Sequence, residues 1–230
     1  MLISVIIPTL NEEERIGSLL KFLTSHPLKN RFEVIVVDGE SEDKTAVIAR
    51  TFDVPVYTSD PCSRALQMNK GAKEAKGDVL YFVHADVQLV PSFVNDIIEA
   101  VSKGFESGCY RFKFDNPSNP LLHINGFFTR FPFKWCRGGD QTLFITKEAF
   151  SRIDGFDERF VIMEDYNLLD RLGQEGLSFK VIAKSIKVSA RKYETNSYLK
   201  VQAANLKAMK MYKKGESPDL IKKFYTSALD

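Results

Sequence analysis

The chain has 230 residues, and 32 Lys and Arg against 30 Asp and Glu give it a formal net charge of +2. With 44% hydrophobic and 27% charged residues it is not wholly disordered, and 13 Gly with 9 Pro exclude a collagen-like repeat. A chain of this length can build one sizeable core without disulfide bonds or metal ions to hold it together.

The N-terminus and the cysteines indicate in which cellular compartment the protein is expected. No apolar run reaches the roughly 18 residues that would span a bilayer. The first apolar run, Val5-Ile6-Ile7, meets Pro8 at once and has neither the basic start nor the cleavage site of a secretion signal. The 3 cysteines are too few and too scattered for a disulfide framework or a zinc ribbon. These features predict a soluble, cytoplasmic protein in a reducing compartment.

The first half of the chain alternates apolar runs with helical patterns. The apolar runs, which are typical of strands covered on both faces, are Leu2–Ile7, Phe32–Val37, Val54–Tyr57 and Val79–Val83. Helices are predicted between them over Glu12–Ser25, Ser41–Thr51 and Ser63–Lys76. We expect Ser41 to cap the second of these helices. Strand–helix–strand repetition predicts an α/β domain with a mostly parallel, Rossmann-like central sheet and helices on both faces.

After Asp86 the pattern changes. Helices are predicted over Pro91–Lys103, Met163–Glu175 and Tyr198–Tyr212, followed by a short C-terminal one, and strands over Cys109–Phe114, Thr142–Ile145 and Phe179–Ile182. The aromatic stretch from Phe127 to Trp135 is more typical of a core or a lid than of a sugar platform. If it is exposed, it favours a lipid or aromatic acceptor.

The C-terminal region is basic. Residues 180–230 hold 12 Lys and Arg against 4 Asp and Glu, while residues 1–179 hold 20 against 26. In the last long helix, Leu199, Ala203 and Leu206 follow helical spacing, and we expect the lysines to lie on the side opposite them. These lysines are Lys200, Lys207, Lys210, Lys213 and Lys214. Such a helix either docks on the domain with a solvated basic face or makes peripheral contact with an anionic membrane.

Polar and acidic residues follow three of the predicted parallel strands. The segments are Pro8-Thr9-Leu10-Asn11-Glu12, Asp38-Gly39-Glu40-Ser41 and His84-Ala85-Asp86. A parallel sheet binds ligands at the carboxyl ends of its strands, so these segments predict a site there. Neither G-x-G-x-x-G nor G-x-x-x-x-G-K-[ST] occurs, which argues against a dinucleotide-binding enzyme and a P-loop phosphotransferase. The phosphates of a nucleotide would instead meet basic side chains and Mg²⁺ or Mn²⁺ on a carboxylate.

Several of these segments together resemble a family 2 glycosyltransferase of GT-A fold. The matching segments, in the family's order, are Ser4–Glu12, Val36–Thr45, Arg64–Ala72, Gly77–Asp86, Gly155–Glu158 and Met163–Leu168. The variants Gln67-Met68-Asn69, His84-Ala85-Asp86 and Gly139-Asp140-Gln141 resemble the subgroup named after radical-SAM and selenodomain neighbours. The resemblance spans residues 2 to about 195, which we take as the GT-A domain, with basic helices over 196–230 packed on or beside it.

The resemblance implies roles on the donor side. Pro8, Leu10 and Glu12 would line the nucleoside pocket, and Asp38 would accept a hydrogen bond from the base. Arg64 would face the diphosphate, because a guanidinium suits phosphate oxygens. Asn69 and Gly71 would shape the packing of their helix near the phosphates.

It also implies a metal ligand and a base. Asp86 matches the last residue of the family's D-x-D motif and would bind Mg²⁺ or Mn²⁺. His84 replaces the first aspartate of that motif. It would touch the ribose or the metal or pack under the site, and it points the same way as Asp86 if the strand persists. In the pair Glu164-Asp165, Asp165 would be the general base and Glu164 would orient the acceptor.

Two further segments carry implied contacts. Gly138-Gly139-Asp140-Gln141 could place Asp140 near the sugar. The family often has a histidine after the last strand, where this chain has Ser189-Ala190-Arg191-Lys192, so Arg191 or Lys192 would serve the diphosphate.

The sequence therefore predicts an inverting, metal-assisted glycosyltransferase that uses a UDP- or GDP-sugar and a lipid-linked or small-molecule acceptor. No nucleic-acid partner is expected. The alternatives are a nucleotidyltransferase, whose Gly-rich basic loop after the first strand is missing here, and a family member that binds nucleotide without turnover. The protein would be cytoplasmic, with a basic C-terminus able to contact the inner face of the membrane.

Overall fold

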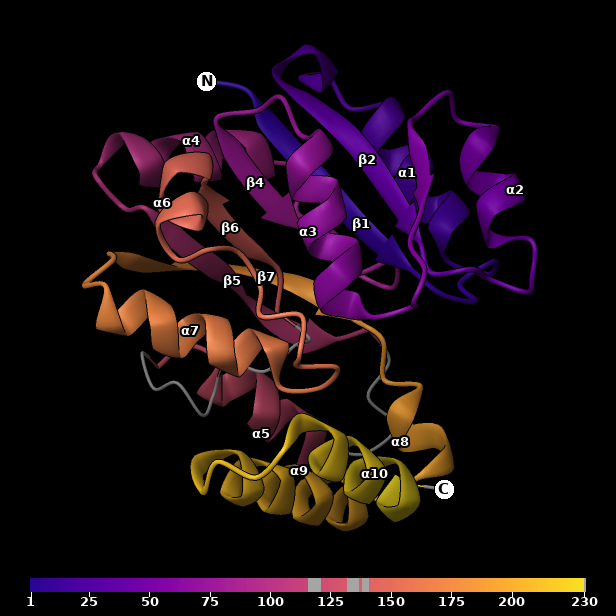
Figure 1. Cartoon of the computed structure of the whole chain (residues 1–230). Coiled ribbons are helices and arrows are strands. Elements are labelled where there is room, and N and C mark those ends of the chain that lie inside the picture. The colour runs from indigo at the N-terminus through magenta and orange to yellow at the C-terminus, as the bar shows by residue number, and fades with distance from the viewer. Residues whose placement is uncertain (116–120, 132–136, 138–140, 230) are drawn as a thin grey trace.

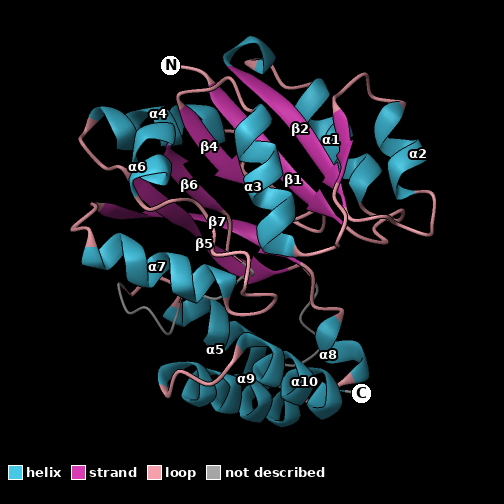
Figure 2. Cartoon of the chain, in the orientation of Figure 1, coloured by secondary structure: helices cyan, strands magenta, loops and turns pink. Residues whose placement is uncertain are grey.

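The computed structural model describes residues 1–115, 121–131, 137 and 141–229. Within them, seven strands form one sheet in the order β3-β2-β1-β4-β6-β5-β7 (Figures 1 and 2). The strands are β1 (Ile3–Thr9), β2 (Phe32–Asp38), β3 (Val56–Thr58), β4 (Val79–Phe82), β5 (Ser107–Phe114), β6 (Leu143–Thr146) and β7 (Phe179–Val188). Of these described strands, β6 alone runs antiparallel to its neighbours β4 and β5. Strands β5 and β7 therefore run in the direction of β1, and the predicted mostly parallel sheet is confirmed.

Helices cover both faces of the sheet. Side chains alternate along a strand, so Val5 and Ile7 of β1 enter one buried cluster and Ile6 enters the other. The first cluster is covered by α1 (Ile16–Thr24), α2 (Thr45–Arg50) and α4 (Phe93–Ser102). The second is covered by α3 (Arg64–Glu74), α6 (Lys147–Arg152) and α7 (Glu164–Gln174), which lie in front of the sheet in Figure 1. The predicted helices on both faces are thus confirmed.

Helix α3 lies unusually close to β1. A Cβ added at Gly71 would stand 2.4 Å from Ile6 Cγ2 and 3.3 Å from Val37 Cγ2, so a glycine is required at this contact. Asn69, on the same helix, donates from Nδ2 to Phe156 O (2.8 Å) and accepts from Phe156 N (2.9 Å). Helix α3 is thereby fixed both to the sheet and to the segment before α7.

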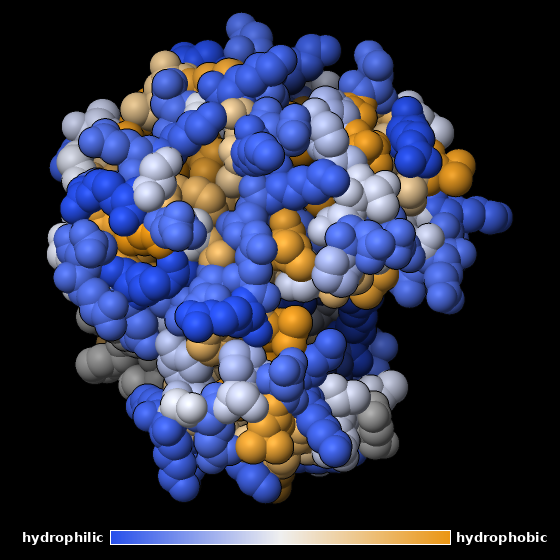
Figure 3. Space-filling view, in the orientation of Figure 1, coloured by the Kyte–Doolittle hydropathy of each residue, from blue (hydrophilic) through white to orange (hydrophobic). Residues whose placement is uncertain are grey.

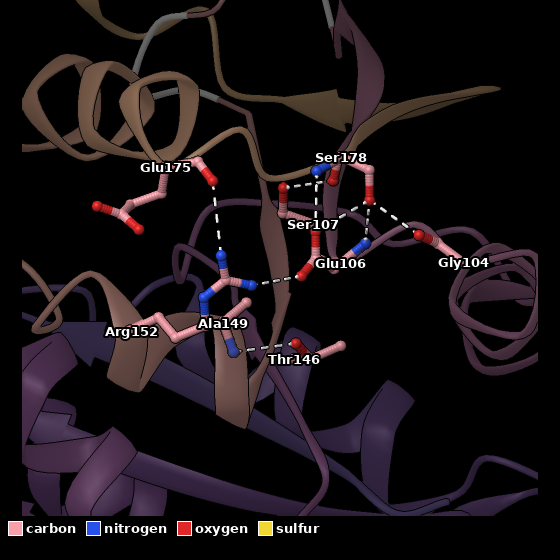
Figure 4. Close-up of polar contacts among 8 residues, drawn as sticks. All are labelled: Gly104, Glu106, Ser107, Thr146, Ala149, Arg152, Glu175 and Ser178. Carbon is pink, nitrogen blue, oxygen red and sulfur yellow. Dashed lines mark hydrogen bonds and ion pairs between the residues drawn. The ribbon is translucent and has the colours of Figure 1, made fainter.

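A polar network fastens the opposite edge of the sheet (Figure 4). Arg152 of α6 donates to Glu106 Oε1 (3.0 Å) and to the carbonyl of Glu175 (3.5 Å). Ser178 donates from its backbone N to Glu106 Oε2 (3.1 Å), and its Oγ donates to Gly104 O (2.8 Å). These contacts join the starts of β5 and β7 to α6, and they lie away from the edge where the parallel strands end.

The C-terminal helices form a layer below the sheet in Figure 1, together with α5 (Leu121–Phe128) and α8 (Lys192–Thr195). Helices α9 (Tyr198–Lys213) and α10 (Pro218–Leu229) bury Ala208, Met211 and Ile221 against one another, with Ile162 and Met163 packed beside them. Tyr212 donates to Asp170 Oδ2 of α7 (2.8 Å). The C-terminal helices therefore contact the segment that leads into α7.

The expected arrangement of α9 is wrong. Its buried row is Val201, Ala204, Ala208 and Met211. Leu199 and Leu206 are 73% and 64% exposed, on the same side as the lysines instead of opposite them. None of the helices that the structure describes is long and apolar enough to cross a bilayer. The face seen in Figure 3 is mostly hydrophilic, with hydrophobic patches set among the polar residues.

Two local expectations also fail. Helix α2 begins at Thr45, whose backbone N donates to Asp43 Oδ1 (2.8 Å), so Ser41 is not its cap. Strand β7 continues to Val188, six residues beyond the predicted end, because it pairs with β5 along its whole length through a register shift.

In the aromatic stretch, Phe127 and Phe128 are partly exposed and do not belong to the core, whereas Trp135 lies outside the described residues.

Candidate active site

Hydrogen bonds connect the loop after β1 to the loop after β2 at the carboxyl edge of the sheet. After β1, Asn11 N donates to Ser41 Oγ (2.9 Å), and Glu42 N donates back to Asn11 Oδ1 (2.9 Å). Glu12 N donates to Thr45 Oγ1 (2.7 Å). Because each loop both donates and accepts, the two loops form one preorganised wall.

The same edge carries strained backbone. Asn11, Glu40 and Met163 have φ of 54°, 63° and 68°, in the left-handed region that non-glycine residues avoid. Each lies in a loop that follows β1 or β2 or leads into α7. Such conformations cost of order 1–3 kcal/mol and persist where the surroundings fix them, typically at functional sites.

The predicted nucleoside residues lie along this wall. Pro8 is buried within β1, and Leu10 is 46% exposed just beyond it. Asp38 is buried at the end of β2, where its Oδ1 accepts from Thr9 Oγ1 (2.9 Å) and Ser41 Oγ (2.6 Å) and its Oδ2 accepts from Ser41 N (2.9 Å). A carboxylate has about four acceptor positions, and the described residues occupy three of those of Asp38.

Gln67 joins α3 to this wall. It is buried, and its Nε2 donates to the carbonyls of Thr9 (2.7 Å) and Val37 (2.8 Å), at the ends of two neighbouring strands. In the sequence Gln67 stands out only as part of a motif, and this role was not predicted. A polar residue on a helix face otherwise formed by Ala65, Met68 and Ala72 is the signal that could have found it.

His84 and Asp86 lie beyond the end of β4. The strand ends at Phe82, and Val87 N donates to His84 O (3.2 Å), which closes a turn. The strand therefore does not persist as far as His84, so strand alternation does not decide how the side chains of His84 and Asp86 point. Both residues are half-buried near the carboxyl edge of the sheet.

Arg191 meets Glu12 in a two-pronged ion pair across 179 residues of sequence. Its Nη1 donates to Glu12 Oε2 (3.1 Å), and its Nη2 contacts Oε1. The Glu12 side chain is 12% exposed and that of Arg191 48%. The carboxylate of Glu12 raises the pKa of Arg191, and the charges of Asp86 and Glu14 act in the same direction. A permanent positive charge therefore stands close to Asp86.

Few side chains at this edge could bind a divalent cation. Among the described residues, no three His, Cys, Asp or Glu side chains are arranged to hold a metal ion. Asp86 is a hard oxygen ligand of the kind that Mg²⁺ and Mn²⁺ prefer, and Mg²⁺ commonly keeps one or two carboxylates and takes its other ligands from phosphates and water. The site thus fits a cation that arrives with a diphosphate.

Arg64 and Glu164 connect the first residues of α3 and α7. Arg64 Nη1 lies 3.1 Å from Glu164 Oε1, with the Glu164 side chain 4% exposed and that of Arg64 50%. Glu164 therefore faces the first turn of α3. Its position in the first turn of α7 also favours negative charge.

Asp165 faces a different small pocket, formed with Cys109, Arg137, Gln141 and Leu169. Burial raises the pKa of the Cys109 thiol to about 12, so this thiol stays protonated. Gln141 is 8% exposed, and its Nε2 has no hydrogen-bond partner among the described residues. The pocket has a volume of about 20 Å³, which is room for one water molecule.

The sequence analysis did not single out Arg137 or Cys109, because neither follows a strand exit. Asp140, which was expected near the sugar, lies outside the described residues.

The fold is that of GT-A glycosyltransferases. A mannosyltransferase from Pyrobaculum calidifontis, solved with GDP-Man and Mn²⁺, superposes with a TM-score of 0.68 at 15% identity, covering 99% of this chain and 68% of the other. Glucosyl-3-phosphoglycerate synthase from Mycobacterium tuberculosis, solved with Mn²⁺ and UDP, gives 0.65 at 17% identity, covering 94% and 80%.

The sequence comparison identifies the family. The model of glycosyl transferase family 2 matches residues 4–155, and the chain belongs to this family. An uncharacterized glycosyltransferase from Haemophilus influenzae is 27% identical over 185 residues, covering 76% of this chain and 63% of that protein. A 4,4'-diaponeurosporenoate glycosyltransferase from Staphylococcus haemolyticus is 37% identical over 116 residues, 47% of this chain and 30% of that protein. The chain thus matches between about a third and two thirds of the length of these relatives.

Proposed function

We propose that this chain transfers a sugar from a UDP- or GDP-sugar to an acceptor hydroxyl, with inversion at the anomeric carbon. The observation that carries the proposal is the contact between Arg64 and Glu164, because it brings the predicted diphosphate arginine next to the predicted acceptor carboxylates. The family membership and the nucleotide complexes of the similar structures support it.

Asp165 acts as the general base. It removes the proton of the acceptor hydroxyl while the hydroxyl oxygen attacks the anomeric carbon, and the bond from that carbon to the diphosphate oxygen breaks. The nucleoside diphosphate leaves with the electron pair. Glu164 orients the acceptor, as the resemblance implies, and it fixes the start of α7 through Arg64.

The leaving group is met by positive charge. Arg64, which also pairs with Glu164, and Arg191 or Lys192 after β7 would supply it, with Arg191 also paired with Glu12. Asp86 would hold Mg²⁺ or Mn²⁺, which would supply further positive charge to the departing diphosphate. His84 would contact either that cation or the ribose, or pack under the site.

The nucleoside lies against the wall made by the loops after β1 and β2. Pro8, Leu10 and Glu12 line it, and Asp38 accepts a hydrogen bond from an N–H of the base. Asp140 stays a predicted sugar contact.

Donor turnover tests the proposal. The protein is incubated with UDP- and GDP-sugars in Mg²⁺ or Mn²⁺, and release of UDP or GDP is measured beside the Asp165→Asn variant. If the wild type releases UDP or GDP and the Asp165→Asn variant does not, the proposal is supported. Release of pyrophosphate from a nucleoside triphosphate and a sugar phosphate would favour the nucleotidyltransferase. Binding without release of any product would favour a non-catalytic family member.

The remaining assignments stay predictions. They are the acceptor class, the radical-SAM and selenodomain subgroup, the cytoplasmic location, the division into residues 1–195 and 196–230, and the membrane contact of the basic C-terminus.

A further inference from the structure

The small pocket beside Asp165 lies between the first turns of α7 and the sheet behind it (Figure 1). Strands β5 and β7, the start of β6 and α7 form its walls, with Cys109, Gln141, Thr142, Asp165 and Phe179 among the lining residues. Its volume of about 20 Å³ excludes an organic ligand, and the carboxylate in its wall disfavours an anion. The occupant that suits this pocket is a single water molecule.

Gln141 presents a hydrogen-bond donor to this pocket. Its Oε1 accepts from Cys109 Sγ (3.6 Å). Because the pKa of this thiol is raised to about 12 by burial, the thiol stays protonated and is the donor in that contact. The contact therefore fixes which end of the amide faces Cys109, and Nε2 is the end left for another partner. Gln141 is more than nine-tenths buried, and a water molecule would satisfy its Nε2.

Thr142 supplies a second donor from the neighbouring position. It is fully buried, and its Oγ1 accepts from the hydroxyl of Tyr81 (3.0 Å). Burial raises the pKa of Tyr81 far above its usual value, so the phenol always donates in this bond. The hydroxyl of Thr142 therefore keeps its own hydrogen for another acceptor, and Thr142 lines the pocket.

These groups satisfy the requirements of a buried water molecule, which typically makes about three hydrogen bonds. The amide of Gln141 and the hydroxyl of Thr142 donate to the water oxygen. The water in turn donates a hydrogen to the carboxylate of Asp165, the charged acceptor in the wall. Tyr81, Thr142, the water and Asp165 then form a chain in which each hydrogen bond strengthens the next.

We propose that Gln141 and Thr142 are positioning residues for Asp165, and that they act through one buried water molecule that donates to its carboxylate. The water fixes the orientation of this carboxylate in the first turn of α7. A hydrogen bond from water also favours the ionised carboxylate, which is the form that a general base needs. This inference rests on the proposed function, since that function makes Asp165 the base.

A high-resolution crystal structure of the full chain tests the water site. The wild type is expected to show one water within hydrogen-bond distance of Gln141 Nε2, Thr142 Oγ1 and the carboxylate of Asp165. Gln141→Met keeps the length of the side chain and removes the amide donor, so the water should be lost. A wild-type pocket without this water, or a water that stays in place in Gln141→Met, refutes the site.

Rates of UDP or GDP release from the donor sugar test the positioning role. Gln141→Met is expected to lower kcat about tenfold, the equivalent of one hydrogen bond, and to leave the donor KM unchanged. Thr142→Val should lower kcat in the same way, and Thr142→Ser should restore most of it. The matched control is Gln202→Met on α9, which removes an amide donor to Tyr193 outside the pocket and should retain the wild-type rate.

Urea denaturation confirms that each variant is folded, and if Gln141→Met is not, the two Thr142 variants carry the test. An unchanged kcat in Gln141→Met, with the water lost, overturns the positioning role and leaves a water that only fills space. A raised donor KM with an unchanged kcat would instead place Gln141 at the donor. If the wild type releases neither UDP nor GDP, the proposed function fails and the role of Gln141 in turnover fails with it. The crystal structure then still decides the water site by itself.

Discussion

Arg64 Nη1 and Glu164 Oε1 lie 3.1 Å apart and join two helices that begin 100 residues from each other. The pair is asymmetric, because the glutamate side chain is 4% exposed and the arginine side chain 50%. The buried carboxylate has the guanidinium as its partner, whereas the arginine side chain is half exposed. The proposed contact of Arg64 with a diphosphate requires such an exposed guanidinium.

Arg64→Gln should lower the free energy of unfolding by about 1–2 kcal/mol, less than for a fully buried pair because the arginine is half exposed. It should also weaken UDP binding. In Arg64→Gln/Glu164→Gln the buried charge is gone, so urea denaturation should show stability restored while UDP binding stays weak. If the double variant recovers UDP binding as well, Arg64 has no role at the phosphates.

Asp165→Asn should keep UDP affinity and lower turnover by roughly 10²–10⁴-fold, the usual contribution of a general base. Glu164→Gln is the matched control, since it removes the neighbouring carboxylate. Steady-state rates of both variants decide the assignment. A larger loss of turnover in Glu164→Gln would move the base from Asp165 to Glu164.

Asp86→Ala should abolish the part of UDP binding that depends on Mn²⁺. Calorimetry with Mn²⁺ and again after chelation with EDTA measures that part. Asp219→Ala, at an exposed position on α10, is the control and should retain it. Metal-dependent affinity that survives in Asp86→Ala would exclude Asp86 as a ligand.

Gly71→Ala should destabilise the protein by about 1–3 kcal/mol, because the added methyl group overpacks the contact between α3 and β1. Gly17→Ala in α1 is the control. Its methyl group would meet Ile48 Cγ2 at an ordinary 3.5 Å, and alanine is the better helix former. Equal urea midpoints for the two variants would contradict the close approach of α3.

The outer face of α9 carries Leu199 and Leu206 among exposed lysines, a combination suited to an anionic bilayer surface. We expect the protein to sediment with phosphatidylglycerol vesicles at low salt and to dissociate at high salt, since each lysine near the surface contributes about 1 kcal/mol. Leu199→Ser/Leu206→Ser should reduce sedimentation, and Val47→Ser on α2 should not. Absence of wild-type protein from the low-salt pellet would refute membrane contact.

The central sheet was predictable from local pattern. Continuous apolar runs such as Phe32–Val37 leave few alternatives to a strand covered on both faces, and the structure places β2 over nearly the same residues. The direction of β6 was not predictable, because a four-residue apolar strand carries no information on its orientation. Helix α6 was missed for a related reason, since six residues are too few to display a helical period.

The prediction for α9 failed because small residues form much of its buried face. Leu199 and Leu206 suggested the docking face by hydrophobicity alone, yet Ala204 and Ala208 allow the close approach of helices that large side chains would prevent. In the candidate site, the strand exits correctly indicated Asp38 and Asp86 as residues of one edge. The pairing of Glu12 with Arg191 could not be predicted, because the two residues follow β1 and β7, which are not neighbours in the sheet.

The position of β6 has a consequence for synthesis of the chain. It inserts between β4 and β5, although it follows both in sequence. A nascent chain that has emerged only as far as β5 therefore exposes an unpaired edge on β4 and cannot yet attach β5. Such open edges pair readily with other chains. Until residue 146 has left the ribosome, β4 therefore keeps an edge with which another chain can pair.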